Sequence, residues 1–307
     1  MSSLLAVGFA FSVFIYGLDA ILVNLAKDFE GNLPFNSATV ALLVDAVKIA
    51  FSLVFLAGES LANHVIHPVS IRESIKFSFP ALLYSINNNL FVVIQVHADP
   101  ATFRILSNMK ILTTAILYRI IMKRLISSKK QLALVLMTLS GMGCSYSGIA
   151  SHKGDAGLDS GHMTLHLSFT GLFLILIYCG ISGLAGVYIE MILKRGTQTS
   201  LHFQNLIMHI YSICFNYFWY WTSSKTSSSF LDGYNAWTVA IVLTQAMNGL
   251  ILSFVFKYGS NLTRILIISC ATLVTTFMSH LIFHLQLDAN FFLALALFLV
   301  AFYLYHR

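Results

Sequence analysis

The sequence predicts an all-α polytopic membrane protein with ten transmembrane helices arranged as a 5+5 inverted repeat. Three features support this fold class: the composition, the recurrence of long apolar runs and a weak internal repeat. Of the 307 residues, 57% are hydrophobic and only 10% are charged, whereas a soluble domain carries about 25% charged residues. The apolar runs alternate with short polar breaks, which excludes a soluble enzyme with a single hydrophobic core.

Each apolar run is long enough to cross a bilayer as a helix. The first run has neither a basic region before it nor a small-residue cleavage site, so it is predicted to be a mature helix and not a signal peptide. The longest polar breaks, 151–165 and 223–234, are predicted loops, so residues 1–307 are expected to form one ten-helix domain with repeats 1–150 and 151–307. The expected spans are 4–26, 35–58, 74–97, 101–122, 131–149, 168–192, 201–222, 235–256, 262–284 and 288–305.

The internal repeat appears when the sequence is shifted by 160 residues against itself. Asn88 then aligns with Asn248, and Arg104 to Leu106 aligns with Arg264 to Leu266. Since each half holds five spans, the second copy must be inverted in the membrane, as in secondary transporters that bind ligands at the repeat interface. A chance match between helix ends is the alternative.

The basic residues are distributed unequally between the predicted loops. If the N-terminus is cytosolic, twelve lysines and arginines lie on the cytosolic side, and only Lys27, Lys153 and Lys225 lie on the other. This asymmetry predicts that both termini are cytosolic. The cluster from Lys123 to Lys130 is interpreted as a topology determinant, with contact to anionic lipid as a lesser role. The net charge of +6 is thereby explained without nucleic-acid binding.

Lys110 lies in the middle of the apolar stretch 101–118. A lysine near the bilayer midplane costs about 2.5–3.5 kcal/mol on insertion scales, so it usually faces an aqueous cavity or a partner. Phe103, Ser107, Lys110 and Thr114 follow at helical spacing and predict one polar stripe. A cation on such a stripe indicates a cavity that binds an anion.

Further polar stripes supply groups suited to a nucleotide. Asparagine offers donors and an acceptor to the edge of a pyrimidine base, aromatic rings can stack on the base or sugar, and cations can bind phosphate. The alternative is hydrogen bonding between helices, which is favoured for Ser212 and Asn216. The candidate substrate-binding residues are Tyr84, Asn88, Phe103, Lys110, Asn205, His209, Ser253, Lys257 and Arg264.

Several charged residues are expected to pair within their own helix, namely Asp45 with Lys48 and Glu190 with Lys194, the latter pair snorkelling at a cytosolic helix end. His209 alone would be a core histidine more often than a ligand, and proton coupling through it is a further alternative. No Ser-His-Asp set, metal-ligand cluster or glycine-rich phosphate loop occurs, so the sequence predicts no catalytic residue, no metal, no cofactor and no enzyme.

Four segments together resemble the signature segments of the Golgi nucleotide-sugar transporters, which are subfamily A of solute carrier family 35 in the drug/metabolite transporter superfamily. They are Tyr84–Asn89, Leu106–Ile111, Gly183–Glu190 and Phe256–Asn261. The resemblance covers nearly the whole chain. Tyr178–Leu184 and Gly259–Arg264 resemble one subgroup, which is associated with CDP-linked alditols such as CDP-ribitol.

The resemblance implies that the chain exchanges a nucleotide sugar for a nucleoside monophosphate by alternating access in the Golgi membrane. In the related CMP-sialic acid carriers, the cytidine site matches Tyr84, Asn88, Asn205 and Ser253, and the phosphate site matches Lys110 with Arg264. The sequence departs from that pattern at five positions, which leaves the base and phosphate half in place and the sugar half open. Phe103 and His209 replace tyrosines, Arg264 replaces a lysine, Asp45 a glutamate and Arg104 a glutamine. A CDP-ribitol-like cargo is therefore expected first, and a CMP- or UDP-sugar next.

Two other functions fit the same residues. An exporter of small organic metabolites would share the fold without needing paired cations, and a non-transporting scaffold would use the polar stripes only to hold helices together. The expected partners are the nucleotide sugar, the nucleoside monophosphate and the lipid bilayer, with homo-oligomerisation left open and nucleic acid excluded.

Overall fold

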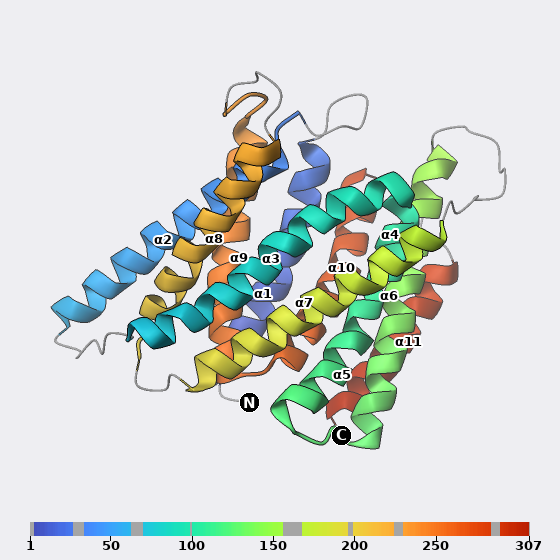
Figure 1. Cartoon of the computed structure of the whole chain (residues 1–307). Helices are drawn as coiled ribbons and strands as arrows, with labels where there is room; N and C mark the ends of the chain where they lie inside the picture. Colours follow the sequence, from blue (N-terminus) through green and yellow to red (C-terminus); the bar gives the residue numbers. More distant parts are fainter. Residues whose placement is uncertain are drawn as a thin grey trace. The chain divides into compact units, whose positions relative to one another are not determined.

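The computed structural model describes residues 3–26, 34–62, 70–98, 100–155, 168–195, 199–223, 230–283 and 289–306. These ranges contain α-helices and one short 3-10 helix, and no strand (Figure 1). Every predicted span coincides with a helix, which for 101–122 includes one 3-10 turn, so the helical segments are confirmed. The helices are α1 (Ser3–Leu25), α2 (Ser37–Leu61), α3 (Ile71–His97), α4 (Pro100–Leu106), η1 (Ser107–Met109), α5 (Lys110–Met122), α6 (Ser128–Asp155), α7 (Phe169–Arg195), α8 (Leu201–Ser223), α9 (Ala236–Tyr258), α10 (Asn261–Phe283) and α11 (Ala289–His306).

In the described ranges, six helical stretches are long and apolar enough to cross a membrane. Val7–Val23 of α1 is a shorter apolar stretch. α8 carries more polar residues, among them Gln204, Asn205, His209 and Asn216. The structure thus confirms an all-helical membrane protein, while ten spans in a 5+5 inverted repeat stay a prediction. The six stretches are Ser37–Leu61, Thr102–Met122, Phe169–Arg195, Ala236–Tyr258, Asn261–Ile282 and Ala289–His306.

The fourth predicted span contains a 3-10 turn, Ser107–Met109, immediately before Lys110. The Asn108 side-chain amide donates to the carbonyls of Arg104 and Ile105, at 3.0 and 3.2 Å, and the Ser107 hydroxyl also donates to the Arg104 carbonyl at 3.0 Å. These side chains compete with the backbone N–H groups that would bond the same carbonyls in a continuous α-helix. The predicted span is therefore helical throughout and forms one candidate membrane span, Thr102–Met122, but the 3-10 turn at 107–109 departs from the single regular α-helical stripe expected for Phe103 and Lys110.

A glycine on α6 allows that helix to approach the 3-10 turn closely. A Cβ atom added at Gly141 would lie 2.5 Å from Asn108 Oδ1, which is closer than van der Waals contact permits. Asn108 also donates to Ser145 Oγ on α6 at 3.3 Å. The 3-10 turn in the fourth span is thus held by contacts with α6 as well as by its own polar residues.

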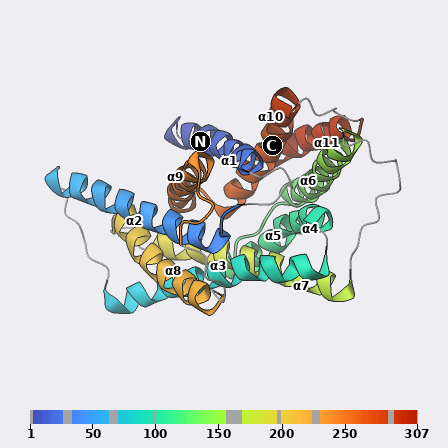
Figure 2. The same cartoon turned by 90° about the horizontal axis from the view of Figure 1, so that it is seen from above.

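The chain forms two compact units, and each combines segments from both halves of the sequence. The first comprises Met1–Ser85 and Tyr188–Arg264, and the second comprises Ile86–Val187 and Ile265–Arg307. In the first unit, α1 packs on α9, and α2 packs on α8 and α9 (Figures 1 and 2). In the second, α6 packs on α11 and on α4 and α5. The residues at 85–86 and 187–188 divide α3 and α7, so both helices contribute to both units.

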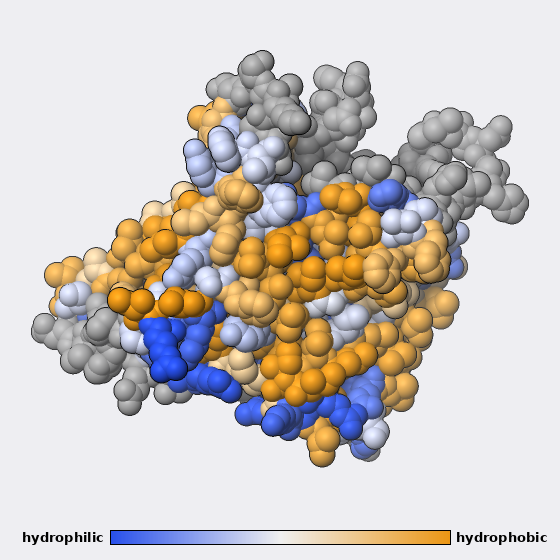
Figure 3. Space-filling model, viewed as in Figure 1, coloured by the Kyte–Doolittle hydropathy of each residue, from blue (hydrophilic) through white to orange (hydrophobic). Residues whose placement is uncertain are grey.

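Each unit has its own apolar core. In the first, Leu22, Phe35, Val44 and Ile241 belong to one buried cluster. In the second, Phe103 packs with Ile94, Ile175 and Cys179. Many large apolar side chains are nevertheless exposed along the helices, and hydrophobic residues cover much of the face drawn in Figure 3. Water would oppose such exposure, whereas lipid tails solvate these side chains.

Candidate functional site

The nine candidate substrate-binding residues are divided between the two units. The first unit contains Tyr84, Asn205, His209, Ser253, Lys257 and Arg264, whereas the second contains Asn88, Phe103 and Lys110. The geometry is therefore given unit by unit.

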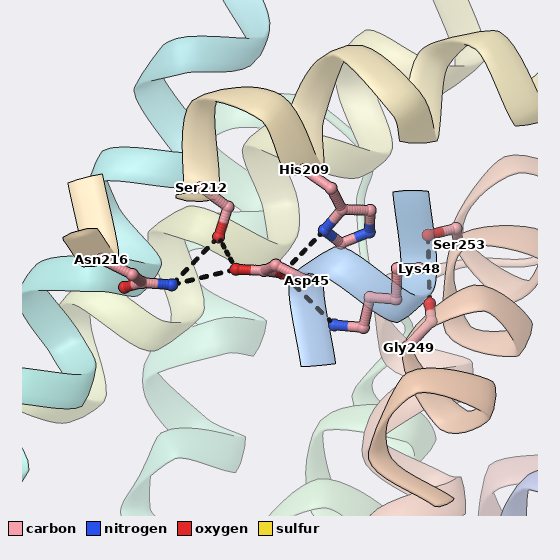
Figure 4. A network of polar contacts seen from close by, with 7 residues as sticks. All are labelled: Asp45, Lys48, His209, Ser212, Asn216, Gly249 and Ser253. Atoms are coloured by element: carbon pink, nitrogen blue, oxygen red, sulfur yellow. Dashed lines mark hydrogen bonds and ion pairs between the residues drawn. The ribbon is translucent and has the colours of Figure 1, made fainter. Parts of the chain in front are cut away.

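A network of polar contacts in the first unit is centred on Asp45 of α2 (Figure 4). The Asp45 carboxylate lies 2.9 Å from His209 Nδ1 and accepts hydrogen bonds from Ser212 Oγ at 2.6 Å and Asn216 Nδ2 at 3.0 Å. The ammonium of Lys48 lies 3.8 Å away. This confirms both the pairing of Asp45 with Lys48 and the interhelical hydrogen bonding predicted for Ser212 and Asn216.

The spacing of the α8 residues explains why they converge on one carboxylate. His209, Ser212 and Asn216 follow at i, i+3 and i+7, so they share a face of α8. A buried carboxylate is costly unless its oxygens accept hydrogen bonds or meet a cation, and Asp45 has both. The network extends to α3, because Asn216 Oδ1 accepts from Ser85 Oγ at 3.0 Å.

The same face of α8 presents two buried polar atoms that have no protein partner within the described ranges. They are His209 Nε2 and, one turn earlier, Oδ1 of Asn205, whose residue is 1% exposed. If neutral His209 donates its Nδ1–H to Asp45, its Nε2 is an acceptor; if protonated, Nε2 is a donor. Nearly all buried polar atoms in native structures are satisfied by protein, water or ligand, so these positions are suited to a polar ligand.

Lys48 lies against Gly249, one turn before Ser253, where α2 approaches α9. A Cβ atom added at Gly249 would lie 2.5 Å from Lys48 Cε and 2.8 Å from its Nζ, so the lysine crosses the helix where a side chain is missing. The hydroxyl of Ser253 donates to the Gly249 carbonyl at 3.1 Å (Figure 4). The Ser253 donor is thus used within its own helix, and its oxygen can still accept.

A second set of charged contacts fastens the turn between α9 and α10. Glu190 is fully buried; its Oε1 accepts from Lys194 Nζ at 2.6 Å, and its Oε2 accepts from the backbone N–H of Asn261 at 2.7 Å. Lys194 also donates to the Gly259 carbonyl at 2.5 Å. The predicted pairing of Glu190 with Lys194 is confirmed. The prediction that the pair snorkels towards water is wrong for Glu190, because its carboxylate is buried against the positive end of α10.

Arg264 lies in the first turn of α10 and is only 7% exposed. Its guanidinium carbon lies 5.5 Å from the centre of the Phe256 ring, and its Nε has no hydrogen-bond partner in the described part of the chain. Lys257, in contrast, donates to the Thr199 carbonyl at 2.7 Å and to Gln204 Oε1 at 3.4 Å. Of these two cations, Arg264 has the more evident capacity for an anion.

In the second unit, Lys110 is the first residue of α5 and is half-buried. The Thr113 hydroxyl bonds the carbonyls of Lys110 and Cys179, at 3.2 and 3.0 Å, which fixes the start of α5 against α7. The Phe103 ring packs edge-on against Phe91 and Tyr178, with centroid distances of 5.0 and 5.1 Å. Phe103 therefore has a packing role, and its stacking on a base stays a prediction, as does the role of the exposed Asn88.

Two polar residues near the candidate site were not predicted as part of it. Tyr16 lies on α1, which packs on α9, and Asn248 of α9 is buried, with no hydrogen-bond partner for its Oδ1 among the described residues. The signal in the sequence was weak: a tyrosine one turn before Asp19 in an apolar run, and an asparagine noted only for the repeat. Among the residues that the structure describes, no group of three His, Cys, Asp or Glu could hold a metal ion.

Comparison with known proteins identifies the family. The nucleotide-sugar transporter family model matches residues 8–306. The chain is 41% identical over 295 residues to the probable UDP-sugar transporter protein SLC35A4 of Xenopus tropicalis, covering 96% of this chain and 89% of the relative. It is 38% identical over 304 residues to the same-named protein of Mus musculus and 35% identical over 304 residues to that of Homo sapiens, with 96% of this chain and 91% of each relative covered.

These relatives are the fourth member of subfamily A, which is the subgroup that Tyr178–Leu184 and Gly259–Arg264 indicate, so the predicted family is confirmed. The family consists of transporters and not of enzymes. The chain belongs to the nucleotide-sugar transporter family and is a multi-pass membrane protein.

Proposed function

We propose that this transporter is a Golgi antiporter that exchanges a pyrimidine nucleotide-linked sugar or alditol for the nucleoside monophosphate by alternating access. CDP-ribitol is the first candidate cargo, followed by CMP- and UDP-sugars; the relatives are named as UDP-sugar transporters. In this proposal ten spans form a 5+5 inverted repeat with both termini in the cytosol, and the nine candidate residues contact the substrate.

The observation that carries the proposal is a set of buried polar atoms without protein partners in the described ranges. Arg264 Nε, Asn205 Oδ1 and His209 Nε2 belong to residues that the sequence had already selected as substrate contacts. An arginine donor suits a phosphate, and an asparagine side chain suits the edge of a pyrimidine base. A nucleotide supplies both kinds of partner.

The 3-10 turn at 107–109 supports an anion site at Lys110. A stretch of 3-10 helix within an α-helix often marks a functional hinge, and Lys110 directly follows this turn at the start of α5. We propose that Lys110 and Arg264 both bind the phosphate groups.

Counterflow into reconstituted vesicles tests the proposal. Vesicles loaded with CMP should take up CDP-ribitol faster than empty vesicles, with CMP-sialic acid, UDP-galactose and a nucleotide-free anion as comparisons. Arg264→Ala should raise the Kd for CMP by about ten- to hundred-fold at any salt concentration, because a charge-assisted hydrogen bond of about 1.5–3 kcal/mol is lost. Lys76→Ala removes an exposed cation from α3 and serves as the control.

Three outcomes would replace the proposal. Uptake that internal CMP does not accelerate would exclude exchange. Transport of small organic anions without nucleotide would favour the metabolite exporter, and a protein that binds neither CMP nor UMP would be the scaffold.

The sequence contains a glycosylation sequon, Asn261-Leu-Thr263. A test of membrane topology nevertheless requires a different reporter. Asn261 is 0% exposed at the first position of α10, so it should stay unglycosylated on either side of the membrane, and its state reports nothing. We expect a glycosylation tag inserted between α6 and α7 to be modified, and a tag at the C-terminus to remain unmodified. Endoglycosidase mobility shifts measure both, and a glycan on the C-terminal tag would contradict the cytosolic termini.

A further inference from the structure

The connection between α5 and α6 gathers positive charge at one end of the second unit. Its cations and those of the adjoining helix turns are all exposed: Arg119, Lys123, Arg124, Lys129 and Lys130. The sequence contains no aspartate or glutamate between Asp99 and Asp155, and none after Asp288. In Figure 3 hydrophilic residues are visible at the lower end of the molecule, where α5 joins α6, and also near the start of α3. Apart from Asp155, the last residue of α6, the helices α4, α5, α6 and α11 therefore contain no acidic side chain that could neutralise this cluster.

The loop that carries the cluster is held in a defined shape. Ile126 is buried at 8% exposure, and the Gln131 side chain donates to its carbonyl at 2.9 Å. Lys123 ends α5 in the left-handed conformation, with φ of 51°. With Ile126 directed inward, Leu125 is left 85% exposed beside the cations. The loop thus presents an exposed apolar side chain together with several exposed cations.

A contact with α11 fixes the other side of the cluster. The ammonium of Lys130 lies 5.3 Å from the centre of the Tyr305 ring. Two candidate membrane spans, Thr102–Met122 and Ala289–His306, end at this point. The cluster therefore lies at a membrane–water boundary, where tyrosine and lysine are both favoured.

We propose that this cluster, residues 119–130 with Tyr305, is a binding site for an anionic phospholipid. The cations bind the phosphate groups of the headgroup, and Leu125 inserts between the acyl chains. Several cations without a nearby acid suit a headgroup with a phosphomonoester, which carries more charge than a phosphodiester alone.

Membrane topology alone does not require this arrangement. The positive-inside rule depends on how many basic residues flank a span, and it requires neither an anchored loop nor an exposed leucine among them. The start of α3 provides a contrast, because there Arg72 and Lys76 flank the acidic Glu73. Those two cations give a matched control on a different unit.

Native mass spectrometry of the full chain in detergent, with thermal unfolding measured in parallel, tests the site. Added phosphatidylinositol 4-phosphate should bind and raise the Tm, phosphatidylserine should do so less, and phosphatidylcholine should have no effect. Neutralising Lys123, Arg124, Lys129 and Lys130 to glutamine should weaken binding by about five-fold per cation. R72Q/K76Q should bind like the unmodified chain.

Further variants guard against misfolding and identify the source of the phosphate. K123Q/R124Q alone keeps the Lys130–Tyr305 contact. Its loss in the logarithm of lipid affinity should be about half of that of the fourfold variant. Leu125→Ser should weaken lipid binding but leave the weak binding of soluble inositol phosphate unchanged. The proposal is overturned if the fourfold variant binds the lipid as the unmodified chain does, if R72Q/K76Q loses as much, or if inositol phosphate binds as tightly as the lipid.

Discussion

Lys110→Ala should abolish exchange of phosphate-bearing substrates while the protein still folds and reaches its membrane. If Lys110 binds the substrate phosphate, its removal takes away a charge-assisted hydrogen bond of about 1.5–3 kcal/mol, which corresponds to about a ten- to hundred-fold higher Kd. It also removes part of the charge neutralisation of a desolvated phosphate. The fold should tolerate the change, because the start of α5 is fixed by Thr113 and by Asn108 and not by the lysine ammonium alone.

Equilibrium binding of CMP and counterflow should be measured on the same preparation of Lys110→Ala. Lys110→Arg should retain part of the binding, since it keeps the charge but changes the geometry. Lys76→Ala, which removes an exposed cation, should match the unmodified protein. Near-normal CMP binding by Lys110→Ala would refute the assignment of this lysine to the phosphate.

Asp45→Ala should destabilise the protein by about 3–5 kcal/mol, since breaking a buried ion pair leaves an uncompensated charge. The substitution removes the acceptor shared by His209, Ser212 and Asn216 and leaves Lys48 without its carboxylate. The measurement is the midpoint of thermal unfolding in a fixed detergent. Because α2 and α8 are joined through this carboxylate, the loss should appear as a lower Tm even in the absence of substrate.

Asp19→Ala is the matched control in the same unit. Asp19 of α1 accepts from Thr244 Oγ1 at 3.2 Å and from Gln245 Nε2 at 3.4 Å, and it is less buried than Asp45. Its removal should therefore lower the Tm less. Replacing both charged partners with apolar residues, as in D45L/K48M, should recover part of the loss of Asp45→Ala, because no lone buried charge remains. Equal effects of Asp45→Ala and Asp19→Ala would contradict the central position of Asp45.

The short-range polar pairs were predictable because helical spacing alone brings their residues together. Asp45 and Lys48 are one turn apart, as are Glu190 and Lys194, and both pairs are present. Spacing could not show the partners from distant segments. His209 is separated from Asp45 by 164 residues, and the N–H of Asn261 from Glu190 by 71, so only the packing of α8 on α2, and of the α9–α10 turn on α7, brings these groups into contact.

The 3-10 turn within the fourth span was a local feature that the sequence pattern did not predict. An apolar run with polar residues at i, i+4 and i+7 indicates a regular helix, but periodicity does not reveal whether a side chain will bond the backbone of its own helix. Asn108 and Ser107 do so, and Gly141 lets α6 close against them. The 3-10 turn before Lys110 therefore depends on a competition between side-chain and backbone donors for the same carbonyls. Tertiary contacts with α6 help to decide that competition.

The sequence by itself determined that this protein is helical, lies in a membrane and belongs to the nucleotide-sugar transporters, because composition, apolar run length and signature segments are properties of the linear chain. It also selected Arg264 and Asn205 as candidate contacts. Only the tertiary structure decided which polar atoms the protein itself satisfies: Lys257 is bonded by Thr199 and Gln204, whereas Arg264 Nε and Asn205 Oδ1 have no partner among the described residues. Hydrogen-bond satisfaction depends on groups brought together from distant helices, and no local pattern contains that information.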